Sequence, residues 1–332
     1  MANTVWKLLS TLCLVFLVPV SDACTSCDKL LLDDALDRHE LALVHVLDMY
    51  VPTSTKEHLG WTTRSSILHA LRWTVRFRQW GDYFCGSGGV SAAFIRHGMT
   101  VGMSLDLSIS SHHNILTDDG FALFLISTLQ MVRLATVVIG LPCSTFVFLS
   151  RGTSKRNRSN QWLGDIDRTD ICQANEIAWR VMILLRVLVL RKVQFIVEQP
   201  LTSCFFILRM FRRFQCIKPV IRCGLFSLPL TRKFIWLGWY GGPDSVPKPT
   251  VLWGCASALL GDNLPSGKPP TRQGRHQIIK STTEKLVKRG KHMKVVKRIY
   301  GIRKAFKATQ EYPRAFCDKL AQLGADCAHH RP

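Results

Sequence analysis

The sequence predicts an α/β protein with a Rossmann-like, doubly wound and mostly parallel sheet. Short apolar segments alternate with longer helix-like segments through the middle of the chain. These short segments are apolar along their length rather than at every second residue, as strands covered on both faces are. Glycines or polar residues follow directly after four of them, and ligands bind outside the carboxyl ends of the strands in open parallel sheets.

The expected elements follow one another over residues 79–197. Strands are expected at Gln79–Cys85, Thr100–Leu105, Leu134–Ile139 and Gln194–Val197, and helices at Val90–His97, Phe121–Leu129 and Thr169–Arg191. Arginines interrupt the most apolar helical stretch, and no segment after residue 23 reaches the roughly 18 uninterrupted apolar residues of a membrane span. We therefore expect no stable membrane insertion by this part of the chain.

Composition divides the chain into four parts. Residues 1–23 carry Lys7 ahead of an apolar run and end in small residues, which is the pattern of a cleaved signal or targeting segment. A buried N-terminal helix is the alternative. Residues 24–78 form a helix-prone extension, and residues 79–260 hold the alternating pattern. Residues 261–332 form a basic tail with a short helix expected at Arg314–Leu323.

Positive charge is concentrated near the C-terminus. The formal charge is +21 over 332 residues, and residues 272–307 contain 13 lysines and arginines against one glutamate. This excess favours a polyanionic partner such as DNA or RNA. A nuclear-localisation patch or a solvated, partly disordered face are the alternatives. The side chains expected at nucleic-acid phosphates are Lys285, Lys288, Arg289, Lys291, Lys294, Lys297 and Arg298.

Composition also excludes two protein classes. An apolar fraction of 47% is too high for a disordered chain. Twelve cysteines at scattered spacings do not predict a disulfide scaffold. A lone C-x-x-C at Cys24–Cys27 has no second pair with which to hold a metal ion.

A glycine-rich turn, Gly86-Ser87-Gly88-Gly89, follows the first expected strand. Glycine lets the backbone approach a ligand closely, and the N-terminus of the helix that follows favours an anionic group. Asp106 ends the next strand, where a carboxylate accepts hydrogen bonds from ribose hydroxyls. A helix N-cap is the alternative for Asp106. Together the turn and the acid predict an adenosine-containing cofactor.

Two candidate catalytic side chains follow the later strands. Cys143 lies in a turn after Pro142, where a helix N-terminus can lower the pKa of the thiol. Glu198 follows an apolar strand, and a carboxyl in apolar surroundings can have a raised pKa and act as an acid. The alternatives are a buried structural cysteine and a surface ion pair with an arginine. These residues indicate a nucleophile and an acid at one edge of the sheet.

Five segments resemble motifs of the cytosine-5 DNA methyltransferases, in the family's order, over about residues 80–255. Residues 82–94 (DYFCGSGGVSAAF) resemble the first motif, and residues 98–106 resemble the second. Leu141–Phe146 resembles the Pro-Cys catalytic loop, and Phe195–Pro200 the Glu-Asn-Val motif. Lys248–Trp253 is similar to a K-P-T-x-L-W stretch of some members. The resemblance implies the class I S-adenosylmethionine-dependent methyltransferase fold.

The resemblance also implies a cofactor, a substrate and a division of roles. The cofactor would be S-adenosyl-L-methionine, and the substrate a cytosine flipped out of DNA. Cys143 would add to C6 of the ring, and Glu198 would hold or protonate N3. We expect a monomer. The residues implied at the cofactor are Phe84, Gly86, Ser87, Gly88, Gly89, Asp106, Asn114 and Pro142.

The chain departs from the family pattern at several positions. Asn114 stands where the family often has aspartate, and Gln199-Pro200 follows Glu198 in place of Asn-Val. Only Gln273–Gln277 comes near the family's Q-x-R-x-R motif. No long target-recognition domain is evident after Glu198, and the family's C-terminal Gly-Asn-Ser segment is missing.

Three alternatives therefore stay open. One is a catalytically degenerate methyltransferase fold that binds nucleic acid, and another is an RNA cytosine methyltransferase. The third is a secreted or organellar protein of unrelated activity, which rests on residues 1–23 alone. Methylation of DNA implies the nucleus or a DNA-containing organelle, whereas the N-terminal segment implies secretory or organellar targeting.

Overall fold

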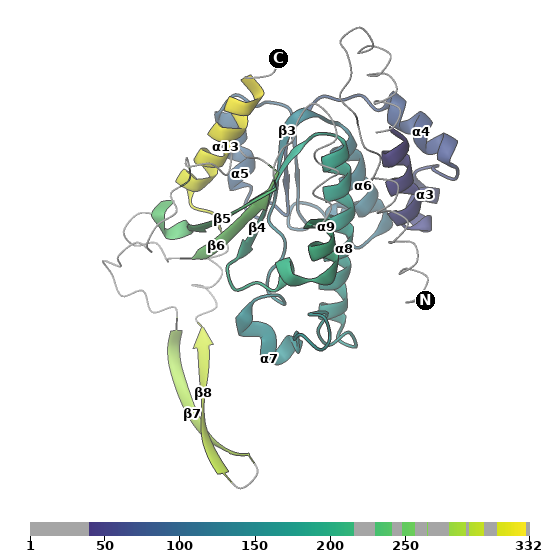
Figure 1. Cartoon of the computed structure of the whole chain (residues 1–332). Helices are drawn as coiled ribbons and strands as arrows, with labels where there is room; N and C mark the ends of the chain where they lie inside the picture. Colours follow the sequence, from purple (N-terminus) through teal and green to yellow (C-terminus); the bar gives the residue numbers. More distant parts are fainter. Residues whose placement is uncertain are drawn as a thin grey trace, which may run out of the picture.

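A six-stranded mixed sheet forms the centre of the protein (Figure 1), in the strand order β2-β1-β3-β4-β6-β5. The computed structural model describes residues 40–215, 230–240, 248–255, 264, 279–289, 292–301 and 311–329. The strands are β1 (Arg78–Tyr83), β2 (Gly102–Leu105), β3 (Met131–Ile139), β4 (Gln194–Pro200), β5 (Thr231–Trp236) and β6 (Pro249–Gly254).

The first four strands are parallel, whereas β6 runs antiparallel to both β4 and β5. The predicted α/β class and mostly parallel sheet are thus confirmed. The antiparallel edge was not predicted. Each of the four predicted strands is present, with ends that differ by at most three residues.

The helices between the strands also follow the predicted order. They are α5 (Gly89–Arg96), α6 (Asp118–Leu129) and α8 (Thr169–Leu190). The predicted start of α6 is three residues late, because the Thr117 hydroxyl accepts a hydrogen bond from the Gly120 amide and caps the helix ahead of its apolar residues.

Alternate strand residues enter two separate hydrophobic cores, one on each face of the sheet. One core contains residues of α6 and α8 and the other residues of α5 and α13 (Arg314–His329). This explains why the strands are apolar at consecutive positions, since both faces are covered. The first core takes Val137, Phe195 and Val251, and the second takes Val138, Ile196 and Leu252.

The N-terminal extension packs against the first core. It comprises a helix over residues 40–50, α3 (Thr53–His58) and α4 (Arg64–Trp73), which Figure 1 shows beside α6. The Thr55 hydroxyl donates a hydrogen bond of 2.6 Å to Asp118 Oδ1 and joins α3 to the start of α6. Across the described ranges, no helix is long and apolar enough to cross a membrane.

The C-terminal part contains a hairpin and a helix. Strands β7 (Ile279–Arg289) and β8 (His292–Gly301) pair antiparallel as a separate two-stranded sheet, which Figure 1 shows extending from the body. Helix α13 extends past its predicted end at Leu323 and packs on α5, with Phe316 and Leu320 in the second core. The described residues do not include four parts of the chain for which predictions were made: residues 1–23, Cys24–Cys27, Gln273–Gln277 and Lys291.

Candidate functional site

The strand order creates a point at which the chain changes direction across the sheet. From β1 the chain passes to β2 on one side, and then crosses over to β3 on the other side of β1. Ligands of open α/β sheets bind outside the carboxyl ends of the strands at such a point. The loops that leave β1 and β3 here are residues 84–88 and 140–147, so the predicted glycine turn and Cys143 both lie at this edge.

The glycine turn has a backbone conformation that glycine favours. Gly86 and Gly88 have φ values of 53° and 71°, and Gly88 precedes the first turn of α5. Apart from the adjoining residues, no atom of the described part of the chain lies within 4 Å of where a Cβ would stand at either glycine. Backbone conformation rather than crowding thus requires these glycines, and open space remains beside the turn.

Asp106 fastens the glycine turn to the end of β2. Its Oδ2 accepts a hydrogen bond of 2.9 Å from the Gly86 amide, and its Oδ1 accepts bonds of 2.7 and 2.6 Å from the Ser108 amide and hydroxyl. Burial raises the pKa of Asp106, but these hydrogen bonds outweigh it and hold the pKa below its ordinary value. The carboxylate is therefore charged at neutral pH, with about one of its four lone-pair directions unused.

A second carboxyl fixes the helix that follows the turn. Asp82 of β1 is buried, and its Oδ2 accepts hydrogen bonds from the Ser91 amide and hydroxyl. Burial raises the pKa of Asp82 to about 6, against the effect of the Ser91 hydrogen bonds. The first aspartate of the motif at residues 82–94 therefore joins β1 to α5 and does not face solvent.

The remaining residues predicted at the cofactor lie on loops at this edge. Phe84 is partly buried, with its ring centroid 5.5 Å from that of Phe124. Ser87 and Pro142 are exposed. The Asn114 Oδ1 accepts a hydrogen bond from the Leu116 amide, so this oxygen is already in use by its own turn.

Cys143 and Glu198 come together at the ends of β3 and β4. Cys143 is half-buried, whereas Glu198 is buried within β4. Burial foremost, and then the negative charge of Glu198, raise the pKa of the Cys143 thiol, and Lys248 opposes them. This direction is opposite to the one that a helix N-terminus would produce. The register of the sheet pairs Ile139 with Val197, so the loop that carries Cys143 leaves β3 beside Glu198.

Glu198 is held by two partners that sequence analysis did not assign to it. The Tyr312 hydroxyl donates a hydrogen bond of 2.9 Å to Glu198 Oε2, and Lys248 Nζ lies 3.5 Å from Oε1. Glu198 Oε1 is buried and has no hydrogen-bond partner among the described residues. One carboxyl oxygen is therefore fixed, and the other is paired by charge alone.

Tyr312 reaches this edge of the sheet from the segment that leads into α13. Burial raises the pKa of its phenol well above the ordinary value, and the nearby Glu198 charge raises it further. The phenol is thus neutral and donates its proton. A Cβ at Gly140 would lie 2.8 Å from Tyr312 Oη, so this glycine gives the phenol access. An aromatic residue and Pro313 ahead of an amphipathic helix were the only local signal.

Gln199 ties the Cys143 loop to β4. Its Nε2 donates a hydrogen bond of 2.9 Å to the Leu141 carbonyl, and its Oε1 accepts one of 2.9 Å from Ser203 Oγ. Gln199 is fully buried. The residue that departs from the family's Glu-Asn-Val pattern therefore positions the loop that carries Cys143.

Arg156 holds the far side of the same loop. Its guanidinium donates to the carbonyls of Thr145 and Trp162, at 2.9 and 2.7 Å, and to Asn175 Oδ1 at 2.8 Å. It also lies 4.1 Å from the ring centroid of Phe146. Only 2% of Arg156 is exposed, which marks it as a structural residue within an otherwise exposed basic segment.

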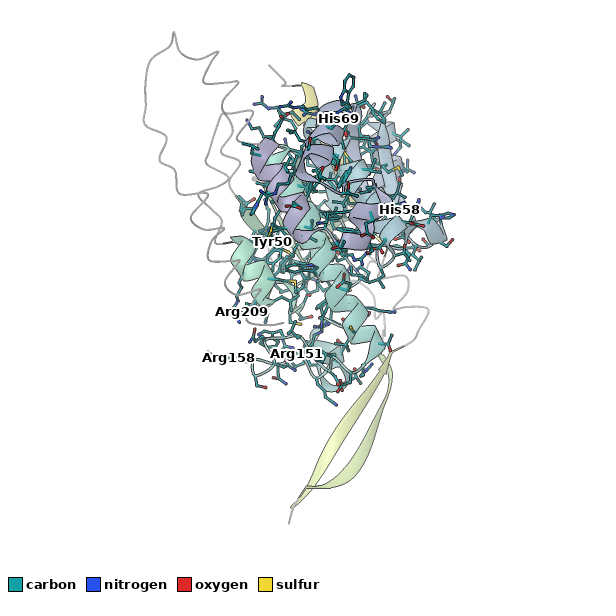
Figure 2. The ribbon with its side chains drawn as sticks, turned by 90° about the vertical axis from the view of Figure 1, so that its right-hand side faces the viewer. Tyr50, His58, His69, Arg151, Arg158 and Arg209 are labelled. Carbon is teal, nitrogen blue, oxygen red and sulfur yellow. The ribbon has the colours of Figure 1, made fainter. Side chains whose placement is uncertain are left out.

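Further arginines gather beyond this loop. Figure 2 shows Arg151, Arg158 and Arg209 at the same end of the molecule. The Arg151 guanidinium lies 5.0 Å from the ring centroids of both Phe148 and Trp162. Positive charge and exposed aromatic surface therefore adjoin the loop that carries Cys143.

Comparison with protein-family models and with curated proteins finds no match for this chain. At the level that the structure shows, it is an α/β protein with a mixed six-stranded sheet and an antiparallel edge.

Proposed function

We propose that the protein is an S-adenosylmethionine-dependent methyltransferase of the class I fold that methylates C5 of cytosine in DNA. The observation that carries this proposal is the position of the Cys143 loop beside the buried carboxyl of Glu198, which the β3–β4 register sets. Glu198 Oε1 has no hydrogen-bond partner among the described residues. The two side chains lie at the same edge of the sheet as the glycine turn, and all three follow the order of the family's motifs.

The residues of this edge fit the proposed cofactor. S-adenosylmethionine, when bound, supplies an electrophilic methyl group. The open space beside Gly86 and Gly88 leaves room for a ligand close to the backbone. The charged Asp106 has acceptor capacity left for a ribose hydroxyl. The resemblance to the methyltransferase motifs assigns four further residues to the same site: Phe84, Ser87, Asn114 and Pro142.

Cys143 and Glu198 would carry the chemistry on the base. Glu198 Oε1 would accept the proton of the Cys143 thiol as the sulfur forms its bond to C6, and would pass that proton on to N3, which directs electron density to C5. After C5 has been methylated, its proton is lost to solvent, the C6–sulfur bond breaks and N3 returns its proton to Glu198. Tyr312 would keep the carboxyl oriented throughout, because its hydroxyl holds the other oxygen.

A second candidate function is a non-catalytic nucleic-acid-binding module with the same fold. The raised pKa of Cys143 favours it, since a protonated thiol is a weak nucleophile. Calorimetric titration with S-adenosylmethionine separates the two, because a purely structural domain has no reason to bind it. RNA in place of DNA as the substrate is a variant of the first candidate.

Labelled methyl transfer tests the proposed activity. The full-length protein, incubated with methyl-labelled S-adenosylmethionine and duplex DNA, is expected to label cytosine. The Cys143→Ala variant is expected to fall to the level of a protein-free control, because no other group forms the bond to C6. The matched control is Cys172→Ala, an exposed cysteine of α8. Equal labelling by all three proteins, or none by the unaltered protein on either DNA or RNA, would contradict the proposal.

A further inference from the structure

We infer that one face of the β7–β8 hairpin binds the phosphate backbone of DNA, and that its opposite face does not. This inference rests on the proposed DNA substrate and adds to it a specific contact surface. The binding face, called the basic face below, is defined by four cationic positions that the strand register places together: Lys285, Arg289, Lys294 and Arg298.

The register of the hairpin assigns its residues to faces. Val287 pairs with Lys294, Lys285 with Val296, and Thr283 with Arg298. Successive residues of a strand alternate between the two faces, so residues of odd number in β7 and their partners share one face. Arg289, which pairs with His292, falls on this same face.

The cations of the basic face form a regular row. Four consecutive cross-strand pairs on this face each contain one lysine or arginine, contributed in turn by β7, β8, β7 and β8. Neighbouring pairs on one face are two residues apart, which is about 7 Å along an antiparallel strand. Phosphates along one strand of duplex DNA rise by about 3.4 Å per nucleotide. The spacing of this row is thus on the scale of one to two nucleotides of the DNA backbone.

The opposite face has a different character. Its paired positions include two lysines, Lys288 and Lys297, and Lys297 pairs in register with Glu284. Lys280 stands at the register shift near the start of β7, outside the paired positions. The formal charge of the paired positions on this face is therefore 2 − 1 = +1, against +4 on the basic face. The other positions of this face are mainly apolar, namely Leu286, Met293, Val295 and Ile299. This composition suits apolar cross-strand pairs that stabilise the ribbon, and it does not suit contact with phosphates.

Two double variants of the full-length protein separate the faces. Lys285→Gln with Lys294→Gln removes two charges from the basic face, and Lys288→Gln with Lys297→Gln removes two charges from the opposite face. Both have the same net charge and the same number of substitutions, so non-specific attraction changes equally. Binding to a labelled 30-base-pair duplex is measured by fluorescence anisotropy between 50 and 200 mM salt. Circular dichroism and thermal melting check that each variant is folded.

The basic-face variant is expected to lower the slope of log K against log salt by about 2, since each phosphate contact contributes about 0.9. The opposite-face variant is expected to keep the slope of the unaltered protein to within about 0.5. Equal loss in both variants, or loss in the opposite-face variant alone, would overturn the inference. If the unaltered protein transfers no methyl group while the two variants still differ in slope, the enzyme proposal alone is contradicted. If the unaltered protein does not bind DNA, both proposals are contradicted.

Discussion

Replacement of Glu198 by glutamine is expected to slow methyl transfer by about 10²–10⁴-fold and, at the same time, to speed alkylation of Cys143 at neutral pH. The first effect follows because glutamine cannot take up the thiol proton and pass it on to N3. The second follows because the Glu198 charge contributes, after burial, to the raised pKa of Cys143. Glutamine keeps an oxygen that can accept the hydrogen bond from the Tyr312 hydroxyl, so the side chain is expected to keep its position.

Iodoacetamide labelling followed by peptide mass spectrometry measures the second effect at the Cys143 peptide. The thiolate is the reactive form, so lowering the pKa moves the rate-against-pH curve towards lower pH. Burial remains in the variant, and the pKa therefore stays above that of an ordinary thiol. Glu176→Gln is the control, because this carboxyl pairs with Arg180 on α8. An unchanged curve for Glu198→Gln would show that the two side chains do not interact in solution.

Replacement of Arg156 by methionine is expected to destabilise the protein by about 3 kcal/mol. The variant leaves the carbonyls of Thr145 and Trp162 and the Asn175 side chain without their donor. A buried acceptor that loses its partner costs about 1–3 kcal/mol, and these three part-buried acceptors are expected near the lower end of that range. Relief from burying the cation offsets part of this sum, and methionine retains the unbranched chain that packs beside Phe146.

Urea denaturation followed by tryptophan fluorescence measures this change in the free energy of unfolding. Arg158→Met is the control two residues away, where the side chain is exposed, and it is expected to change the free energy of unfolding by about 0.5 kcal/mol or less. Similar denaturation midpoints for the two variants would contradict a structural role for Arg156.

The parallel part of the sheet was predictable because its signals are local. Strands β3 and β4 are buried along most of their length and contain apolar runs, whereas β1 and β2 are less apolar and are marked by the glycine turn and by Asp106 that follow them. The antiparallel edge gives no such signal. The first four residues of β5 alternate between half-buried and exposed positions, and only Ile235 of this strand is buried. β6 pairs with β5 and with β4, which lies about 50 residues earlier in the chain.

The site divides in the same way between local and distant signals. Cys143 and Glu198 could be predicted because each follows an apolar run, although Glu198 lies within β4, three residues longer than predicted, and not beyond its end. Tyr312 lies 114 residues from Glu198, and no local pattern predicts that contact. Arg156 was missed because its partners are set by the folded loop, while its neighbours in the sequence are those of an exposed basic segment. The direction of the Cys143 pKa shift likewise depends on burial and on Glu198.

Covalent trapping at Cys143 tests the central proposal most directly. The substrate is a duplex whose cytosines carry fluorine in place of hydrogen at C5. Release of the sulfur normally requires loss of the C5 proton, and fluorine cannot leave in this way. The C6–sulfur bond therefore persists after methyl transfer. We expect a denaturation-resistant complex that requires S-adenosylmethionine, maps to the Cys143 peptide and is absent for Cys143→Ala. No complex with the unaltered protein, or an equal amount with Cys143→Ala, would contradict nucleophilic attack by Cys143.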